Sequence, residues 1–324
     1  ADLEATRTGF GAGSDNATLT SLATTYQGGS NGSTLKADGS GTLLNLAALT
    51  TFNRHSSQFN TTNIIARDGG TVDLTGLGGF TDAAVATQGR LEVSADNGVI
   101  LLDGVTAIQN RTHFEAINGG QITGSLTSAL NSALTLGGGG SVLDLSALTD
   151  VTGSTITATN GGVINLAVGV VINDTDLIAN KPLGGSDNAA LTSAATSWVG
   201  ANSARVFEAS GTGTMLDLSA LTSLTRHTNQ FQTHTIRARD GGTVDLSGLS
   251  GFTSNGLASE GRLNVTADGG TVDVSGISAI STRVTYSAIN GGQIIGALSQ
   301  VIDSAMTLDG NGSSLDFSAL TDIS

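Results

Sequence analysis

Residues 66–81 ("ARDGGTVDLTGLGGFT") and 238–253 ("ARDGGTVDLSGLSGFT") differ only at Thr75 against Ser247 and Gly78 against Ser250. The same offset, 172 residues (238 minus 66), aligns the chain with itself without a gap from Gly13 to the C-terminus, and roughly half of the aligned positions are identical. A gapless internal duplication indicates one structural block copied in tandem. We therefore expect a first block of about seven coils over residues 1–172 and its copy over 173–324, continuous as one solenoid.

Each block contains a shorter period, in which an alanine or leucine precedes a Gly/Asn/Asp turn and an alternating segment. Successive starts in the first block lie 29, 29, 21, 20 and 22 residues apart, at Ala37, Ala66, Ala95, Ala116, Leu136 and Ala158. The second block repeats the pattern from Ala209, Ala238, Ala267, Ala288 and Leu308. A period of 20 to 29 residues is typical of a solenoid, and about seven coils per 172 residues predict about thirteen coils in the chain.

Strands rather than helices carry each coil. In "TVDLTGL" (71–77) Val72 and Leu74 alternate with polar residues, which is the two-residue period of a strand with one buried face. Gly-Gly, Asn-Gly and Asp-Gly pairs supply corners with positive φ. The predicted fold is all-β, a single-stranded parallel β-helix, right-handed by the general preference of parallel crossovers. The extra residues of the longer coils, 50–63 and 81–90, are expected to bulge as loops.

Composition excludes several function classes. The net charge is −14 with 13 basic residues and no basic stripe, which argues against a nucleic-acid partner. There is no cysteine, so neither a disulfide nor a thiolate metal site can form. The sequence contains no run of about eighteen apolar residues, so it predicts no membrane insertion in this segment. A cysteine-free, acidic, Thr/Ser/Asn/Gly-rich chain favours an extracellular bacterial surface protein.

The most distinctive polar cluster is "RHSSQF" (54–59) and its copy "RHTNQF" (226–231). Arginine and histidine near acids could hold a uronate or supply a lytic base, because lyases use such residues on a β-helix face. The alternative is a histidine at the top of a loop and arginines paired with acids of their own or neighbouring coils. The candidate binding residues are Arg54, His55, Gln58, Arg226, His227 and Gln230.

A second candidate is a column of outward carboxylates, one in most coils. Stacked about 5 Å apart, carboxylates repel one another or share a hard cation. This cation ladder would comprise Asp73, Asp144, Asp217, Asp245, Asp273 and Asp316, with Leu101 interrupting it. The alternative is that each carboxylate accepts hydrogen bonds from the turn that follows it. No resident cofactor or metal is expected, and calcium stays an alternative.

The "NGG-x-V/I-x-L" coils, such as "NGGQI" at 118–122 and "NGGVINL" at 160–166, resemble the right-handed β-helix repeats of bacterial autotransporter passengers and filamentous-haemagglutinin-like adhesins. The resemblance implies a non-enzymatic structural or adhesive shaft in a large extracellular repeat protein or fibre. The chain starts and stops within its 172-residue period, which predicts further repeats or end-to-end stacking of copies. A surface glycan or receptor is a further expected partner. The alternative function is a carbohydrate-active β-helix, either an acidic polysaccharide lyase or a glycan-binding module.

Overall fold

The computed structural model describes residues 2–7, 16–28, 31–54, 59–81, 89–201, 203–226, 231–253, 261–280, 283–302, 304–316 and 318–323. It divides into two compact units, Ala1–Leu148 and Thr149–Ser324. Strands and turns make up the described residues, and no helix occurs among them. Consequently these residues contain no helical segment that could cross a membrane. The expected 172-residue blocks are a period of the sequence and stay a prediction about domains.

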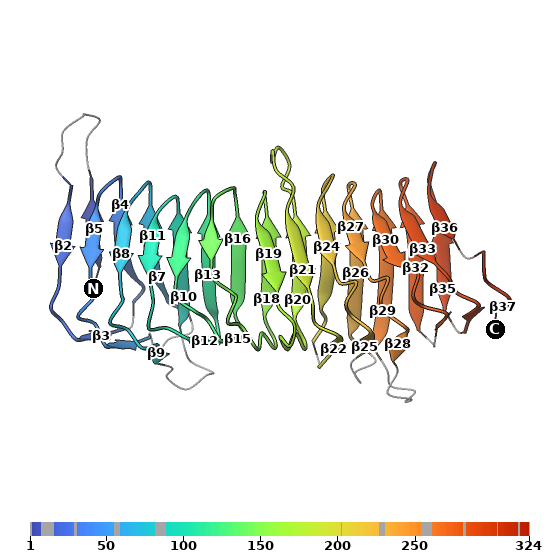
Figure 1. The fold of residues 1–324 in the computed structure, drawn as a ribbon, viewed down its shortest axis with the longest axis horizontal. Coiled ribbons are helices and arrows are strands. Elements are labelled where there is room, and N and C mark those ends of the chain that lie inside the picture. The colour runs from blue at the N-terminus through green and yellow to red at the C-terminus, as the bar shows by residue number, and fades with distance from the viewer. Residues whose placement is uncertain are drawn as a thin grey trace. The chain divides into compact units, whose positions relative to one another are not determined.

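The first unit is built from parallel strands that wind around three faces, each strand pairing with its counterparts in the adjacent coils (Figure 1). The first face contains β1 (Leu3–Thr6), β4 (Ser33–Asp38), β7 (Thr61–Arg67), β10 (Arg90–Asp96), β13 (Thr112–Ile117) and β16 (Ala133–Gly137). The second face contains β2 (Thr18–Thr20), β5 (Leu43–Asn45), β8 (Thr71–Asp73), β11 (Val99–Leu101), β14 (Gln121–Thr123) and β17 (Val142–Leu143). The third face contains β3 (Thr25–Gln27), β6 (Thr51–Asn53) and β9 (Phe80–Thr81), and separately β12 (Ala107–Gln109) and β15 (Ser128–Leu130).

The second unit has the same three faces. The first contains β18 (Thr155–Thr159), β20 (Asp176–Asn180), β23 (Val206–Ser210), β26 (Thr233–Arg239), β29 (Arg262–Asp268), β32 (Val284–Ile289) and β35 (Ala305–Leu308). The second contains β19 (Val163–Leu166), β21 (Ala190–Ser193), β24 (Met215–Asp217), β27 (Thr243–Asp245), β30 (Thr271–Val274), β33 (Gln293–Gly296) and β36 (Ser314–Asp316). The third contains β22 (Ser197–Val199), β25 (Ser223–Thr225) and β28 (Phe252–Thr253), and separately β31 (Ala279–Ile280), β34 (Gln300–Val301) and β37 (Asp322–Ile323).

The register confirms the predicted coil pattern. Ala37, Ala66 and Ala95 are direct partners on neighbouring strands, and so are their counterparts in the second unit. The first face contains thirteen strands in total, in agreement with the expected number of coils. Two of these strands have alanines that the sequence pattern did not include, Ala5 and Ala179. The parallel β-helix is therefore confirmed, whereas its handedness stays a prediction.

Alternation along the strands produces the core. In β7 and its neighbours every second side chain is buried, which gives a ladder of small alanines beside larger aliphatic residues. Several aromatic residues also lie inside, whereas Phe59 and Phe231 are exposed. Phe52 is fully buried and stacks on Tyr26 with ring centroids 4.4 Å apart, and Trp198 is 1% exposed. The interior thus accommodates large rings near the third face.

The corner after the first face explains the recurring "NGG" letters. Asn118 and Gly119 have φ of 53° and 86°, in the left-handed region that Asn and Gly adopt at low cost. The Asn118 side chain donates to Asp96 Oδ1 of the preceding coil at 2.8 Å. A Cβ on Gly120 would lie 1.9 Å from the Ala95 carbonyl oxygen, so the second glycine permits the backbones of neighbouring coils to approach.

The two long insertions are only partly loops. Residues 51–53 form β6 and β7 begins at Thr61, so much of the segment 50–63 belongs to the sheets. Residues 80–81 form β9, which contributes to the third face. Of the other insertion residues, 55–58 and 82–88 lie outside the described part of the chain.

Candidate functional site

Arg54, the first residue of the predicted Arg/His cluster, lies inside the coil. Its side chain is 3% exposed. The guanidinium donates to the carbonyl oxygens of Gly89, Gln109 and Arg111 at 2.8, 3.1 and 3.2 Å. It also donates to Thr112 Oγ1 at 3.1 Å. One charged side chain therefore satisfies acceptors from two other coils.

Its copy, Arg226, is fully buried and donates to the Gly261 carbonyl oxygen at 3.3 Å. Gly261 is the 172-residue counterpart of Gly89, so both blocks use the same contact. Both guanidinium groups thus lie in the interior and not on the exposed loops that the sequence suggested. Because they are buried, a ligand in solvent cannot contact either of them.

The other four members of the predicted cluster, His55, Gln58, His227 and Gln230, lie outside the described residues. A binding role for these four side chains stays a prediction. Of the arginines that follow the cluster, Arg67 donates to Asp38 Oδ2 on the neighbouring strand at 2.7 Å. The Arg67 guanidinium, together with Lys36 Nζ at 2.7 Å, holds the pKa of the Asp38 carboxyl below its ordinary value.

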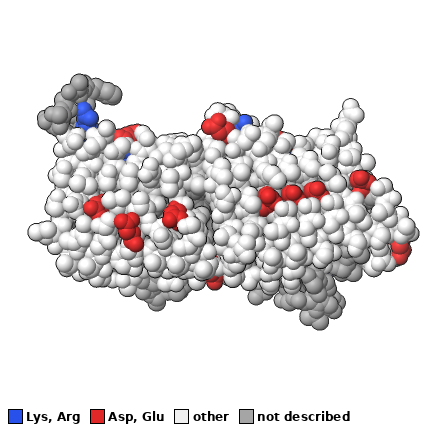
Figure 2. Space-filling view, viewed as in Figure 1, with Lys and Arg blue, Asp and Glu red and all other residues white. Residues whose placement is uncertain are grey.

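The predicted carboxylate column exists in part. Asp217, Asp245 and Asp273 are direct partners on β24, β27 and β30, and Figure 2 shows a row of acidic side chains over these strands. Asp273 is separated from Asp316 by Ile295 on β33. The column is therefore continuous over three coils of the second unit.

Each member of the column binds its own turn. Asp245 Oδ1 accepts from the Ser247 backbone amide at 2.9 Å. The same contact to the residue two positions later forms at Asn45, Asp73, Asp144, Asp217, Asp273 and Asp316. At Asp144 the Ser146 hydroxyl also donates, and this hydrogen bond lowers the pKa of the carboxyl. The geometry is that of an Asx turn, which was the alternative to a cation ladder.

Metal ligation has no further support in the described ranges. They contain no group of three or more His, Asp or Glu side chains placed to hold an ion. In the first unit, Leu101 is the direct partner of Asp73, as the sequence indicated. The calcium alternative stays a prediction.

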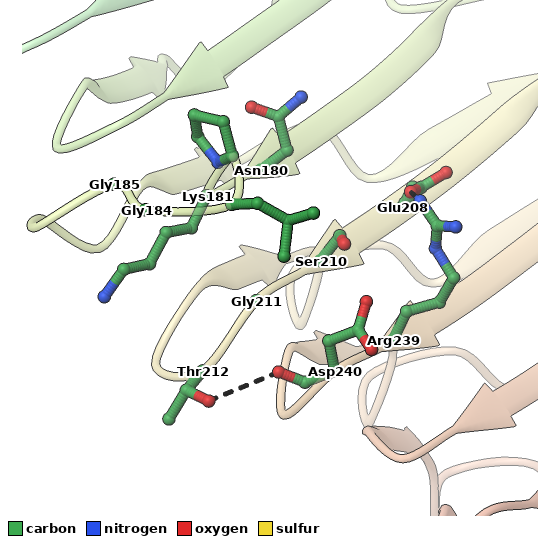
Figure 3. A pocket seen from close by; sticks show the side chains of 12 residues that line it. Asn180, Lys181, Gly184, Gly185, Glu208, Ser210, Gly211, Thr212, Arg239 and Asp240 are labelled. Carbon is green, nitrogen blue, oxygen red and sulfur yellow. Dashed lines mark hydrogen bonds and ion pairs between the residues drawn. The ribbon is translucent and has the colours of Figure 1, made fainter.

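Figure 3 shows a hollow of about 570 Å³ beside the Lys181–Gly185 turn of the second unit. Arg239 extends toward Glu208 and donates to its Oε1 at 2.6 Å, while Lys181 extends away from this pair. Arg237 donates to the other oxygen of Glu208. Lys181 Nζ donates to Asn188 Oδ1 at 3.2 Å. The cations of this hollow thus all have partners within the protein.

A hollow of about 530 Å³ in the first unit has a different charge balance. We call it the arginine hollow. It lies where β10, β13 and β16 begin, and its lining includes Arg90, Glu92, Arg111, His113, Asn131 and Ser132. The two arginines are exposed. Two arginines and a histidine therefore line this hollow together with one acidic residue, in a chain whose net charge is −14.

A hydrogen-bond chain orders one wall of the arginine hollow. His113 Nδ1 donates to Glu92 Oε2 at 2.9 Å, and His113 Nε2 lies 3.0 Å from Thr135 Oγ1. The three residues come from successive strands, β10, β13 and β16. Both ring nitrogens have partners, so the imidazole is held in one orientation, with its adjacent carboxylate already hydrogen-bonded.

The candidate binding residues predicted from the sequence include neither Arg90 nor Arg111. A signal for both was present, because they return at the 172-residue offset as Arg262 and Arg283. The proximity of Arg90 and Arg111 could not be predicted from the sequence, because the strand register places them on adjacent coils. The corner is held by the hydrogen bond from the Leu91 amide to the Arg111 carbonyl oxygen at 3.1 Å.

Comparison of the chain with protein-family models, with curated proteins and with solved structures found no match. The resemblance to autotransporter and haemagglutinin-like repeats therefore has no support from these comparisons, and the fold described above is the structural finding.

Proposed function

We propose that this chain is a segment of a non-enzymatic structural or adhesive shaft in a large extracellular bacterial repeat protein or fibre. The observation that carries the proposal is the use of polar and charged side chains to bond one coil to the next. Arg54 bridges to acceptors 35 to 58 residues away, and Arg67 pairs with Asp38 on the adjacent strand. Charged side chains of the kind that an enzyme would direct at a substrate here form contacts between coils.

The duplication supports the same role. The Gly261 contact of Arg226 reproduces the Gly89 contact of Arg54, and the Asn290 to Asp268 bond, at 2.7 Å, reproduces that of Asn118. Copying a set of structural contacts adds coils of the same kind, because neighbouring coils contribute most of the stability of a repeat array. The expected result of duplication is greater length.

The runner-up is a carbohydrate-active β-helix that uses the Arg/His loops to bind or cleave an acidic polysaccharide. Burial of Arg54 and Arg226 removes two residues of that site from solvent. The role would then depend on His55, Gln58, His227 and Gln230, which lie outside the described residues. We therefore favour the shaft.

Length measurement tests the shaft directly. Proteins with one, two and three copies of the 172-residue block would be imaged by electron microscopy. Seven coils spaced at about 4.8 Å predict a stiff particle that lengthens by about 34 Å per added block. Particles that bend freely between blocks would refute the shaft. Chain cleavage of polygalacturonate by the purified protein would instead establish the enzymatic alternative.

A further inference from the structure

We propose that the arginine hollow of the first unit binds the carboxylate or sulfate groups of an anionic polysaccharide. This inference goes beyond the shaft role, because it assigns a ligand class to one exposed site. It also differs from the Arg/His loop hypothesis, since it uses Arg90, Arg111 and His113 in place of Arg54 and Arg226.

The two arginines occupy neighbouring coils at the same corner. Leu91 N donates to Arg111 O at 3.1 Å, and Arg111 N donates to Asn131 O at 3.1 Å, so three successive corners are hydrogen-bonded in a column. Coils stacked in this way are about 4.8 Å apart. Guanidinium groups at that separation can each present a planar pair of donors to one carboxylate or sulfate, or to two neighbouring ones.

The backbone of Arg111 provides a second, independent observation. Its φ is 57°, in the left-handed region that residues with a long side chain seldom occupy. The corresponding Arg283 in the second block has φ of 67°. Glycine or asparagine would satisfy such a corner at lower cost, as they do elsewhere in this chain, so an arginine here indicates that its side chain has a use.

The single acid in the lining does not cancel the attraction for an anion. Glu92 Oε2 accepts from His113 Nδ1, and this contact places the imidazole next to the carboxylate. The Glu92 and His113 side chains are 33% and 31% exposed. Glu92 therefore limits the affinity for an anion without abolishing it, and removal of its charge should tighten binding.

The shape and charge of the site indicate the ligand class. The hollow opens across β10, β13 and β16, and the exposed polar side chain of Asn131 beside the arginines can bond saccharide hydroxyls. Duplex nucleic acid requires a row of cations along the surface, which this acidic chain lacks. An extended polysaccharide can place single charged groups on a small cationic site, and binding should weaken as salt increases.

The test measures binding of the whole chain to immobilised polygalacturonate, dextran sulfate and uncharged dextran at low ionic strength. The test variant is Arg90→Ala with Arg111→Ala, and the control, matched in charge, is Arg67→Ala with Arg239→Ala, two arginines outside the hollow that pair with Asp38 and Glu208. We expect the test variant to lose at least about tenfold in affinity and the control to stay within about threefold of the parent. Thermal unfolding followed by circular dichroism verifies that both variants fold.

A third variant, Glu92→Gln, removes the negative charge and retains an acceptor for His113. The proposal predicts that it binds the polyanion several-fold more tightly, whereas a purely structural role for Glu92 predicts no gain. Binding to polygalacturonate identifies carboxylate as the preferred group, and binding to dextran sulfate identifies sulfate. The proposal is overturned if the parent protein binds neither polyanion, if it binds uncharged dextran equally, if both double variants lose equally, or if Glu92→Gln weakens binding. The particle length that tests the shaft proposal is independent of all these outcomes.

Discussion

Replacement of Gly120 by alanine tests how closely the coils approach at the corner. The added Cβ would lie 1.9 Å from the carbonyl oxygen and 2.5 Å from the carbonyl carbon of Ala95. Both atoms belong to the backbone of the preceding coil, so no side-chain rotation can relieve the overlap. The coils must separate locally, which strains the neighbouring hydrogen bond from Gln121 N to Gly98 O, now 2.8 Å.

The magnitude follows from two contributions. Overpacking a rigid site costs about 1–3 kcal/mol, and loss of one backbone hydrogen bond costs about 0.5–1.5 kcal/mol. We therefore expect Gly120→Ala to lower the free energy of unfolding by about 2–4 kcal/mol. Stacked coils can open locally, so hydrogen exchange of the amides in β13 and β14 would be measured alongside urea unfolding.

Two further alanine substitutions, one at the copied corner and one at an open site, test whether the overlap at Gly120 causes the loss of stability. Gly292, the copy of Gly120, would place its Cβ 2.0 Å from the Ala267 carbonyl oxygen and should show the same loss. Gly139 has no atom within 4 Å of its Cβ position, so Gly139→Ala should raise stability by about 0.4–1 kcal/mol. The reasoning is refuted if Gly120→Ala unfolds within about 0.5 kcal/mol of the parent, or if it and Gly139→Ala change stability alike.

Four other substitutions test the polar contacts. Arg54→Met leaves buried carbonyl oxygens without a donor and should lower the free energy of unfolding in urea by about 3 kcal/mol or more. Arg67→Met removes a half-exposed ion pair and should lower it by at most about 1 kcal/mol. Equal losses would contradict the assigned burial. Asp245→Asn retains the turn acceptor and should be as stable as the parent, whereas Asp245→Ala should lower the free energy of unfolding by about 0.5–1.5 kcal/mol. A similar loss in both variants would favour a role for the charge itself. The pKa of Asp38 is lowered in the folded state, so its contribution to stability is present above the ordinary value of 3.8 and is lost as pH falls below it. NMR titration should place the Asp38 pKa below 3.8 and show it rise in Arg67→Met; an unchanged value would exclude Arg67 as the cause.

The coil pattern could be predicted because its determinants are close in sequence. The "NGG" and "DGG" corners and the alternation of Val72 and Leu74 each act within a few residues, so period and strand direction are readable without a structure. The strand containing Ala179 was missed because its corner continues into the Lys181–Gly185 turn and not into an ordinary Gly pair. Likewise, short strands such as β6 carry too few alternating residues to be distinguished from loops.

The sequence by itself determined the all-β class and the coil period, since these depend on local backbone preferences and on copies of one pattern. It left two alternatives for the outward carboxylates, and the structure shows the Asx turns. Only the tertiary structure decided which charged residues are buried and which meet. Arg54 appears exposed in a polar stretch, yet its carbonyl acceptors come from residues 35 to 57 positions later and exist as a group only when coils stack. Arg90, Arg111 and His113 converge for the same reason, because their proximity depends on strand register, a long-range property that no local pattern encodes.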